Sequence, residues 1–305
     1  MSNNEKYEFF ARKYIPLLNF KKILLYPAGE KFALITGATS GIGKAFAYSL
    51  AGLGHNLIIT GRKLQVLTEV TDDIKSKYNI EVIKVVADLS VQSDIESLLR
   101  IISNKKIDIL INNAGYGIKE QFHHDEINNQ LKMLKVHVTS PLILIHAVMD
   151  IMMKEKCGSI INVSSLAAFF PTSGNAMYAS TKSFLKNFTL SLRMEMKQYN
   201  IQVQCLCPGF TYTDFHRNAG LDKSSSLQNR IGWMDADKVV KYSLHSLEKG
   251  KVICVPGILN KVTFALIHVV PACTLARLSD LVYCRLFKQK NTLHKKSLIE
   301  SVQLT

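Results

Sequence analysis

The stretch KFALITGATSGIGKAFAYSLAGLG, residues 31–54, decides the fold of this chain. Its first residues form a short apolar run typical of a buried strand, and its second half has the pattern of a helix. Between them lies a turn with Gly37, Gly41 and Gly43, spaced GxxxGxG rather than the more usual GxGxxG. Glycines permit a tight turn and let the backbone approach a pyrophosphate at the N-terminus of the following helix. The stretch therefore predicts a strand, a dinucleotide-binding turn and a helix.

The alternation of strand and helix continues along the chain. Further strands are predicted at 56–60, 80–86, 107–112, 158–163, 201–207 and 251–255, with helices at 63–78, 90–102, 128–154 (broken near Pro141) and 177–199. Strands that alternate with helices of this length pair in parallel through right-handed crossovers. We therefore expect an α/β fold with a doubly wound parallel seven-stranded sheet, the Rossmann fold. It forms a single domain over residues 31–257, with extensions at 1–30 and 258–305.

Polar residues gather directly after the predicted strands. In such a sheet ligands bind outside the carboxyl ends of the strands, so these residues should meet at one edge. The segments concerned are Thr36–Gly43, Thr60–Arg62, Asp88, Asn112–Gly115, Ser164–Ser165 and Pro208–Thr213. This agreement between topology and polar residues indicates a ligand site.

The end of the second strand indicates which dinucleotide binds. A carboxylate is expected there when the adenosine ribose carries a free 2′-hydroxyl, but the sequence reads Thr60-Gly61-Arg62-Lys63. An arginine suits a 2′-phosphate, and the missing acid removes repulsion. NADP is therefore expected rather than NAD. The alternative is that Arg62 and Lys63 only begin a solvated helix.

Tyr178 and Lys182 lie four positions apart on a predicted helix, so their side chains share one face. A cation beside a phenol favours the phenolate, so we expect Lys182 to lower the pKa of Tyr178. That would make the tyrosine an acid or base near neutral pH. Ser165, at the end of the preceding strand, is placed to hydrogen-bond the same reacting oxygen.

Taken together, these motifs resemble the classical short-chain dehydrogenase/reductase family over residues 31–257. The resemblance is to a bacterial branch with an extended apolar C-terminus, and more distantly to hydroxysteroid and 3-oxoacyl-thioester reductases. It rests on Thr36-Gly37-x-x-x-Gly41-x-Gly43, Asn112-Asn113-Ala114-Gly115, Ser165, Tyr178-x-x-x-Lys182 and Pro208-Gly209. It implies that Ser165 polarises a substrate carbonyl and that Tyr178 is the general acid in reduction. Lys182 would hold the nicotinamide ribose.

The resemblance also implies a set of residues around the cofactor. Asp88 would contact the adenine, Asn112 would support the sheet, and the backbone after Pro208 would meet the nicotinamide amide. Ser164 is the rival of Ser165, but the family's serine lies thirteen positions before the tyrosine. The implied cofactor-binding residues are Thr36, Gly37, Ser40, Gly41, Ile42, Gly43, Arg62, Asp88, Leu89, Asn113, Ala114, Gly115, Tyr178, Lys182, Pro208, Gly209, Thr211 and Thr213.

His137 is a departure from the family pattern. The family has an asparagine there that supports a proton path to the lysine, whereas this chain reads Lys135-Val136-His137-Val138-Thr139. A neutral imidazole can hold a water or pass a proton, but it cannot copy a carboxamide's paired donor and acceptor. His137 is thus either a fourth catalytic residue, in a substituted relay, or a helix histidine beside a solvent-filled path.

The expected function is NADP(H)-dependent interconversion of a carbonyl and a secondary alcohol. Phe169, Phe170, Tyr116 and Phe210 flank the predicted pocket and suggest an apolar, lipid-, steroid- or acyl-like substrate. The polar insertion at 209–234 is expected to close over it as a lid. The alternative function is an NADP-binding sensor or scaffold with little turnover.

Composition limits the partners. The 305 residues carry 38 Lys and Arg against 24 Asp and Glu, a net charge of +14. The chain shows no nucleic-acid-binding motif, so we expect no nucleic-acid partner, and its six cysteines lack metal-ligand spacing, so we expect no metal site and free thiols. We expect a homodimer or homotetramer in the cytoplasm.

Membrane association is left open by the two extensions. Residues 1–30 lack the features of a signal peptide and suggest an amphipathic segment that packs on protein or on a membrane. Residues 258–305 are apolar and then basic, and the uncharged run from Val262 to Ala276 is shorter than the ~20 residues that span a bilayer. They would lie in a membrane interface, cover a lipid-like substrate, pair with another subunit or form a folded cap.

Overall fold

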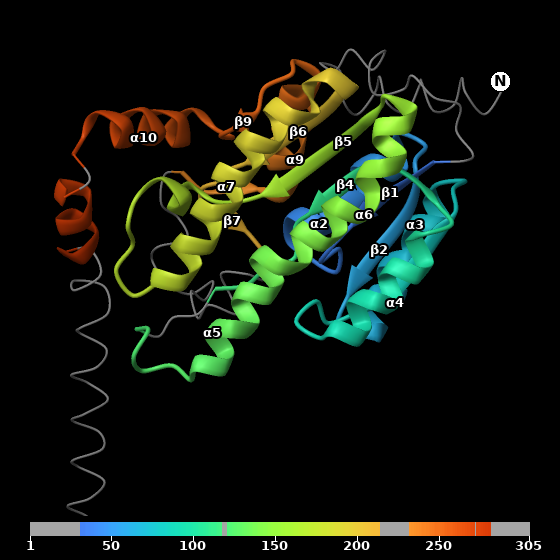
Figure 1. Ribbon diagram of the computed structural model, residues 1–305, viewed down its shortest axis with the longest axis horizontal. Coiled ribbons are helices and arrows are strands. Elements are labelled where there is room, and N and C mark those ends of the chain that lie inside the picture. Colours follow the sequence, from blue (N-terminus) through green and yellow to red (C-terminus); the bar gives the residue numbers. More distant parts are fainter. Residues whose placement is uncertain (1–30, 118–120, 214–231, 272, 282–305) are drawn as a thin grey trace, which may run out of the picture.

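The computed structural model describes residues 31–117, 121–213, 232–271 and 273–281. Its main sheet has the strand order β3-β2-β1-β4-β5-β6-β9, and all neighbours are parallel, as the sequence predicts (Figure 1). The order reverses between β1 and β4, which places a switch point beside the glycine turn. The strands are β1 (Lys31–Ile35), β2 (Asn56–Gly61), β3 (Val82–Val86), β4 (Lys106–Asn112), β5 (Gly158–Val163), β6 (Ile201–Leu206) and β9 (Ile253–Cys254).

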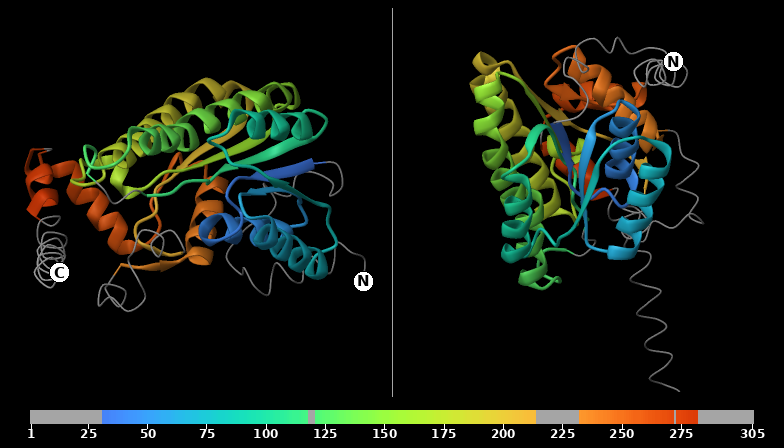
Figure 2. Two further views of the ribbon diagram at one scale, coloured as in Figure 1. Left: turned by 90° about the horizontal axis from the view of Figure 1, so that it is seen from below. Right: turned by 90° about the vertical axis from the view of Figure 1, so that its right-hand side faces the viewer.

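Helices cover both faces of the sheet. One face packs against α2, α3 and α9, and the other against α4, α6 and α7, so the central strands are buried on both sides (Figure 2). This explains why the strands read as continuous apolar runs rather than as alternating ones. The helices are α2 (Gly41–Gly52), α3 (Leu64–Lys77), α4 (Gln92–Ile102), α5 (Ile127–Leu134), α6 (Ser140–Glu155), α7 (Ala176–Met196), α9 (Ala236–Glu248) and α10 (Ile258–Val269). Short 3-10 helices lie at Leu166–Phe169 and Lys197–Tyr199.

The predicted break near Pro141 is a π-helical turn. It spans Lys135–Thr139 and joins α5 to α6. Proline has no N–H to donate and its ring clashes with the carbonyl four residues earlier, here that of His137, so a widened turn is a physical way to accommodate it. The whole stretch Ile127–Glu155 is long and apolar enough to cross a membrane. Because Leu144 and Val148 are fully buried against the sheet, we interpret it as a core helix.

Two features near the C-terminus are absent from the sequence expectations. The helix α9 packs beside α2, and a small parallel sheet joins β7 (Thr211–Tyr212) to β8 (Met234–Asp235). This small sheet bounds the insertion at 209–234, most of which lies outside the described residues. The lid therefore stays a prediction.

The first part of the C-terminal extension is helical. The helix α10 lies at one end of the molecule beside the 3-10 helix Leu166–Phe169, and residues 273–281 are helical too (Figure 1). Residues 1–30 and 282–305 lie outside the described part of the chain, so the domain boundaries and the roles of both ends stay predictions.

Candidate active site

The glycine turn is held in a conformation that needs glycine. Gly37 and Gly41 have φ angles of +67° and +54°, a region that side chains disfavour. A Cβ on Gly43 would lie 2.3 Å from the carbonyl oxygen of Gly37. The turn therefore brings α2 close against the end of β1, as the sequence predicts.

Asn113 braces this turn from the end of β4. Its amide nitrogen donates to the carbonyl oxygens of Thr36 (2.9 Å) and Gly37 (3.1 Å). The hydroxyl of Thr36 in turn accepts the backbone N–H groups of Asn113 (2.9 Å) and Ala114 (3.0 Å). These donors are thus used within the protein, and the structure assigns the pair a supporting position in the predicted cofactor site.

The N-terminus of α2 fits an anion. Ser40 is the N-cap residue but its side chain makes no capping hydrogen bond, and the first turn contains no acidic residue. The exposed N–H groups of a helix N-terminus attract phosphate. Ile42 lies in the same turn, and Arg62 lies exposed at the end of β2. The donor set therefore fits a phosphorylated dinucleotide.

Asp88 follows β3 at the same edge of the sheet. Burial raises the pKa of its carboxyl, but two hydrogen bonds from Ser90 and the charge of Arg62 outweigh burial and lower it. Asp88 is thus ionised at neutral pH, and the positive charge of Arg62 favours its ionised form. The next residue, Leu89, is buried below it.

Ser165 and Tyr178 share a hydrogen bond at the end of β5. The serine hydroxyl accepts the backbone N–H of Ala167 (3.1 Å) and also hydrogen-bonds the phenol of Tyr178. Burial raises the pKa of Tyr178 to about 12, although the hydrogen bond from Ser165 lowers it. The phenol is therefore protonated at neutral pH, and the two hydroxyls can meet one substrate oxygen.

Lys182 lies one turn further along α7. Its ammonium group donates to the carbonyl oxygen of Val163 (2.9 Å) and lies 5.7 Å from the centre of the Tyr178 ring. Burial lowers the pKa of Lys182 to about 8. The expectation that Lys182 lowers the pKa of Tyr178 is wrong in this structure, since the ammonium donates to Val163 and burial dominates the pKa of the phenol.

Ser164 has a structural role. It is buried, and its hydroxyl donates to the backbone carbonyl oxygen of Lys182 (2.8 Å). The geometry thus favours Ser165 as the serine of the site. Asn112 also lies in the interior, where its amide donates to the Asn162 side chain (2.9 Å) and so ties β4 to β5.

His137 is buried between the loop after β4 and α7. Its Nε2 accepts the backbone N–H of Tyr116 (3.0 Å), and its Nδ1 lies 3.0 Å from the hydroxyl of Thr181. These partners place the ring proton on Nδ1, and the Thr181 hydroxyl donates to the carbonyl oxygen of Tyr178 (2.8 Å). Burial and the charge of Lys182 hold the pKa of His137 well below 6.5. Both ring nitrogens have protein partners, which counts against a proton relay through the ring.

Thr181 is a residue that the sequence did not indicate. It connects His137 to Tyr178, but a threonine inside a helix carries no distinguishing signal. Gly115 is also required here, because a Cβ would lie 3.0 Å from Nε2 of His137 and 3.5 Å from Nζ of Lys182. The imidazole and the lysine therefore share one small space.

The segment after β6 reaches the glycine turn. The carbonyl oxygen of Pro208 accepts the N–H of Leu166 (3.0 Å), and Thr211 is buried in β7. A Cβ on Gly41 would meet the Thr213 side chain at 2.7 Å, and one on Gly209 would meet Asn260 at 2.4 Å. The predicted cofactor residues thus lie along one continuous edge.

The aromatic residues predicted beside the pocket have protein partners. The Phe169 ring contacts Phe264 edge to face (centroids 4.8 Å apart), and Phe210 stacks on Trp233 (5.2 Å). Tyr116 contacts His137 edge to face. They line the region, but they do not by themselves establish an apolar substrate.

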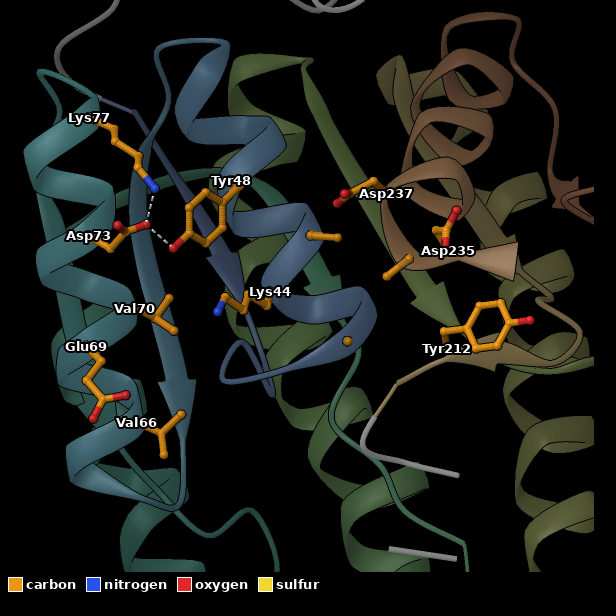
Figure 3. Close-up of a pocket in the computed structure, with 13 residues that line it drawn as sticks. Lys44, Tyr48, Val66, Glu69, Val70, Asp73, Lys77, Tyr212, Asp235 and Asp237 are labelled. Carbon is orange, nitrogen blue, oxygen red and sulfur yellow. Dashed lines mark hydrogen bonds and ion pairs between the residues drawn. The ribbon is translucent and has the colours of Figure 1, made fainter. Parts of the chain in front are cut away.

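A separate groove of about 860 Å³ lies between α2, α3 and α9 (Figure 3). Tyr48 and Lys77 both bind the Asp73 carboxylate on its wall, and none of Ser165, Tyr178 or Lys182 lines it. The groove therefore adjoins the glycine turn through Gly41 but does not contain the three catalytic candidates.

Comparison with known proteins identifies the class. The fold and the strand-end cluster are those of a dinucleotide-dependent dehydrogenase, and the family model "short chain dehydrogenase" matches residues 31–224. The chain belongs to this family of oxidoreductases, as its motifs predict. Residues 258–305 lie beyond the match, and the assignment to a bacterial branch stays a prediction.

Three similar proteins illustrate the range of relatives. A very-long-chain 3-oxoacyl-CoA reductase-like protein of Arabidopsis thaliana is 34% identical over 224 residues, covering 70% of this chain and 72% of that protein. "Inactive hydroxysteroid dehydrogenase-like protein 1" of Homo sapiens is 29% identical over 231 residues, covering 75% and 68%. The structure of a short-chain dehydrogenase from Sphingobium yanoikuyae in complex with NADPH superposes with a TM-score of 0.70 at 25% identity, covering 80% and 96%.

Proposed function

We propose that this protein reduces a carbonyl to a secondary alcohol, and catalyses the reverse oxidation, with NADP(H). The observation that carries the proposal is the hydrogen-bonded pair of Ser165 and Tyr178, with Lys182 one turn away, beside the glycine turn. When bound, the cofactor supplies or accepts the hydride at the carbonyl carbon.

The residues of the chain would handle the proton and the charge. In reduction, the protonated Tyr178 donates its phenolic proton to the carbonyl oxygen. The hydroxyl of Ser165 donates a hydrogen bond to the same oxygen and stabilises the negative charge that develops there. In oxidation Tyr178 must first lose its proton, and because its pKa is about 12, the oxidation rate should rise with pH.

The preference for NADP over NAD rests on the end of β2. The exposed Arg62 is directly followed by Lys63, and no carboxylate stands in the segment from Thr60 to Leu64. A guanidinium pairs well with a phosphate, so it would hold the 2′-phosphate. The NADPH found with the Sphingobium yanoikuyae protein supports the same cofactor.

His137 would act as a neutral brace. It links the backbone of Tyr116 to α7 through Thr181, so it would fix the loop that follows β4 against the helix that carries Tyr178 and Lys182. A low pKa keeps the ring uncharged beside the Lys182 ammonium. His137 is then a positioning residue rather than a proton carrier.

The substrate is proposed to be apolar, of the lipid, steroid or acyl type. The proposal draws on the aromatic and apolar surroundings of Phe169 and on the likeness to an acyl-CoA reductase-like protein. We also propose a homodimer or homotetramer, since Leu131 on α5 and Phe184 on α7 expose apolar surface on neighbouring helices. Light scattering of the purified chain would measure the assembly.

A sensor that binds NADP with little turnover is the second candidate. One observation favours it, the likeness over three quarters of the chain to a human protein whose name calls it inactive. The presence of Ser165, Tyr178 and Lys182 in hydrogen-bonding positions counts against it.

One experiment tests both candidates. NADPH oxidation is measured with panels of ketones, aldehydes and acyl thioesters, alongside NADPH binding by fluorescence. We expect turnover that Tyr178→Phe abolishes while NADPH binding persists. Tight binding without turnover across all panels would favour the sensor, and normal turnover in Tyr178→Phe would refute the proposed mechanism.

A further inference from the structure

The outer face of α10 is an exposed aliphatic surface. We define it by Ile258, Leu259, Val262, Leu266 and Val269, which are 76%, 49%, 51%, 58% and 82% exposed. Asn260 is the only residue of this helix that is buried. Soluble proteins rarely expose such contiguous apolar surface without a partner.

The helix is fixed with this face pointing outward. At 100° per residue, Asn260, Phe264 and His268 share the opposite side. The Asn260 amide donates to the carbonyl oxygen of Pro256 (2.8 Å). The Phe264 ring contacts the rings of Phe169 and His268, with centroids 4.8 Å and 4.3 Å away. The contacts of Asn260 and Phe264 thus fix the inner side of the helix against the protein and leave the outer face exposed.

Residues 273–281 extend the surface. Leu278 and Leu281 are 52% and 60% exposed. The segment is tied to the loop before α7, because the backbone N–H of Ser173 donates to the Ser279 hydroxyl (3.2 Å) and the Ser173 hydroxyl donates to Asp280 (3.1 Å). Both apolar segments thus lie at the end of the molecule where the chain runs from Ser165 to Tyr178 (Figure 1).

The basic residues around the outer face of α10 indicate what binds there. Lys261 flanks the outer face and Arg277 stands beside Leu278, and the 24 residues that follow Leu281 contain five basic residues and one acidic residue. An aliphatic face with flanking cations, followed by a basic segment, suits the interface of an anionic bilayer. With 12 residues α10 is too short to span a bilayer, so it would lie in the plane.

We infer that the outer face of α10, with Leu278 and Leu281, docks this protein on the surface of an anionic lipid bilayer. The inference goes beyond the proposed reaction and does not require it. One consequence does rest on the proposed function: docking would hold the segment between Ser165 and Tyr178 near the lipid, where apolar carbonyl compounds dissolve.

Vesicle binding of the full chain tests the inference. The probes are sedimenting vesicles of phosphatidylcholine alone and of phosphatidylcholine with phosphatidylglycerol. The test variant is Val262→Asp with Leu266→Asp. The control is Met194→Asp, which changes an apolar residue on α7 that is more exposed (73%) than Val262 or Leu266. Thermal melts establish that each variant is folded, and NADPH turnover without vesicles tests the proposed reaction separately.

We expect binding to the anionic vesicles that weakens as salt rises. The double variant should lower the ratio of bound to free protein by about tenfold or more for each substitution, because a buried Val or Leu is replaced by a charge. The control should bind like the original chain. Equal binding by the double variant, or no binding by the original chain, would overturn the inference. A lower mass of the double variant in light scattering, without vesicle binding by the original chain, would instead assign the face to a second copy.

Discussion

Replacing Lys182 with methionine should stabilise the protein while it abolishes turnover. The ammonium group is buried, and its pKa falls from 10.5 to about 8. A shift of this size corresponds to about 3 kcal/mol by which folding disfavours the charged form. The lost hydrogen bond to Val163 offsets about 1–2 kcal/mol of this, so we expect a net gain of about 1–2 kcal/mol at pH 7.5.

The sign of the effect follows from the direction of the shift. Below pH 8 the lysine is charged in both the folded and the unfolded state, so the full burial cost is present. Between pH 8 and 10.5 the folded state is neutral while the unfolded state stays charged, so the cost falls as pH rises. The gain in the free energy of unfolding that Lys182→Met gives should therefore shrink by about 2 kcal/mol between pH 7.5 and pH 10.

Urea unfolding of both proteins at the two pH values measures this difference. Lys186→Met is the matched control one turn further along α7, where the half-buried ammonium lies 4.7 Å from the centre of the Phe169 ring. Because this ammonium is only half-buried, Lys186→Met should not give the gain in stability that Lys182→Met gives at pH 7.5. Destabilisation by Lys182→Met at pH 7.5, or a gain that does not change with pH, would refute the reasoning that this buried charge is a cost retained for catalysis.

Four other substitutions test the site. Because His137 stays neutral, His137→Asn should keep the shape of the turnover profile between pH 6 and 9, and a lost or shifted limb would instead support a proton relay. Arg62→Glu should raise the KM for NADPH by about tenfold or more and leave the KM for NADH nearly unchanged. Equal changes in both KM values would show that Arg62 does not bind the 2′-phosphate. Ser165→Ala should lower kcat by about 100-fold or more. Ser164→Ala should cost about 1 kcal/mol of stability in a thermal melt and change kcat by no more than a few fold. A larger loss of kcat in Ser164→Ala than in Ser165→Ala would make Ser164 the catalytic serine.

The regular part of the fold was accessible from the sequence. The central strands of the main sheet are largely apolar and buried on both faces, whereas Lys84 and Val86 of the edge strand β3 are exposed. The helix α7 begins at Ala176, one residue before the predicted start at 177. The helix α9 was missed although Val240, Leu244 and Leu247 recur at helical spacing. That signal directly follows the polar insertion at 209–234.

The environment of each side chain was harder to predict from the sequence. Spacing placed Tyr178 and Lys182 on one face, but their pKa values depend on how completely the surrounding chain excludes water, and this has no local signature. In the same way, sequence marked His137 as unusual but could not show that both of its nitrogens are already bound.

The sequence by itself determined the main-sheet strands along the chain, most of the helices between them, the glycine turn and the residues that follow each strand. These depend on periodicity and spacing, which are local properties of a chain. Only the tertiary structure decided that burial keeps Tyr178 protonated, that His137 joins Tyr116 to Thr181, and that α10 turns its aliphatic face outward. Those outcomes depend on desolvation and on contacts between segments far apart in the chain, so only their packing could fix them.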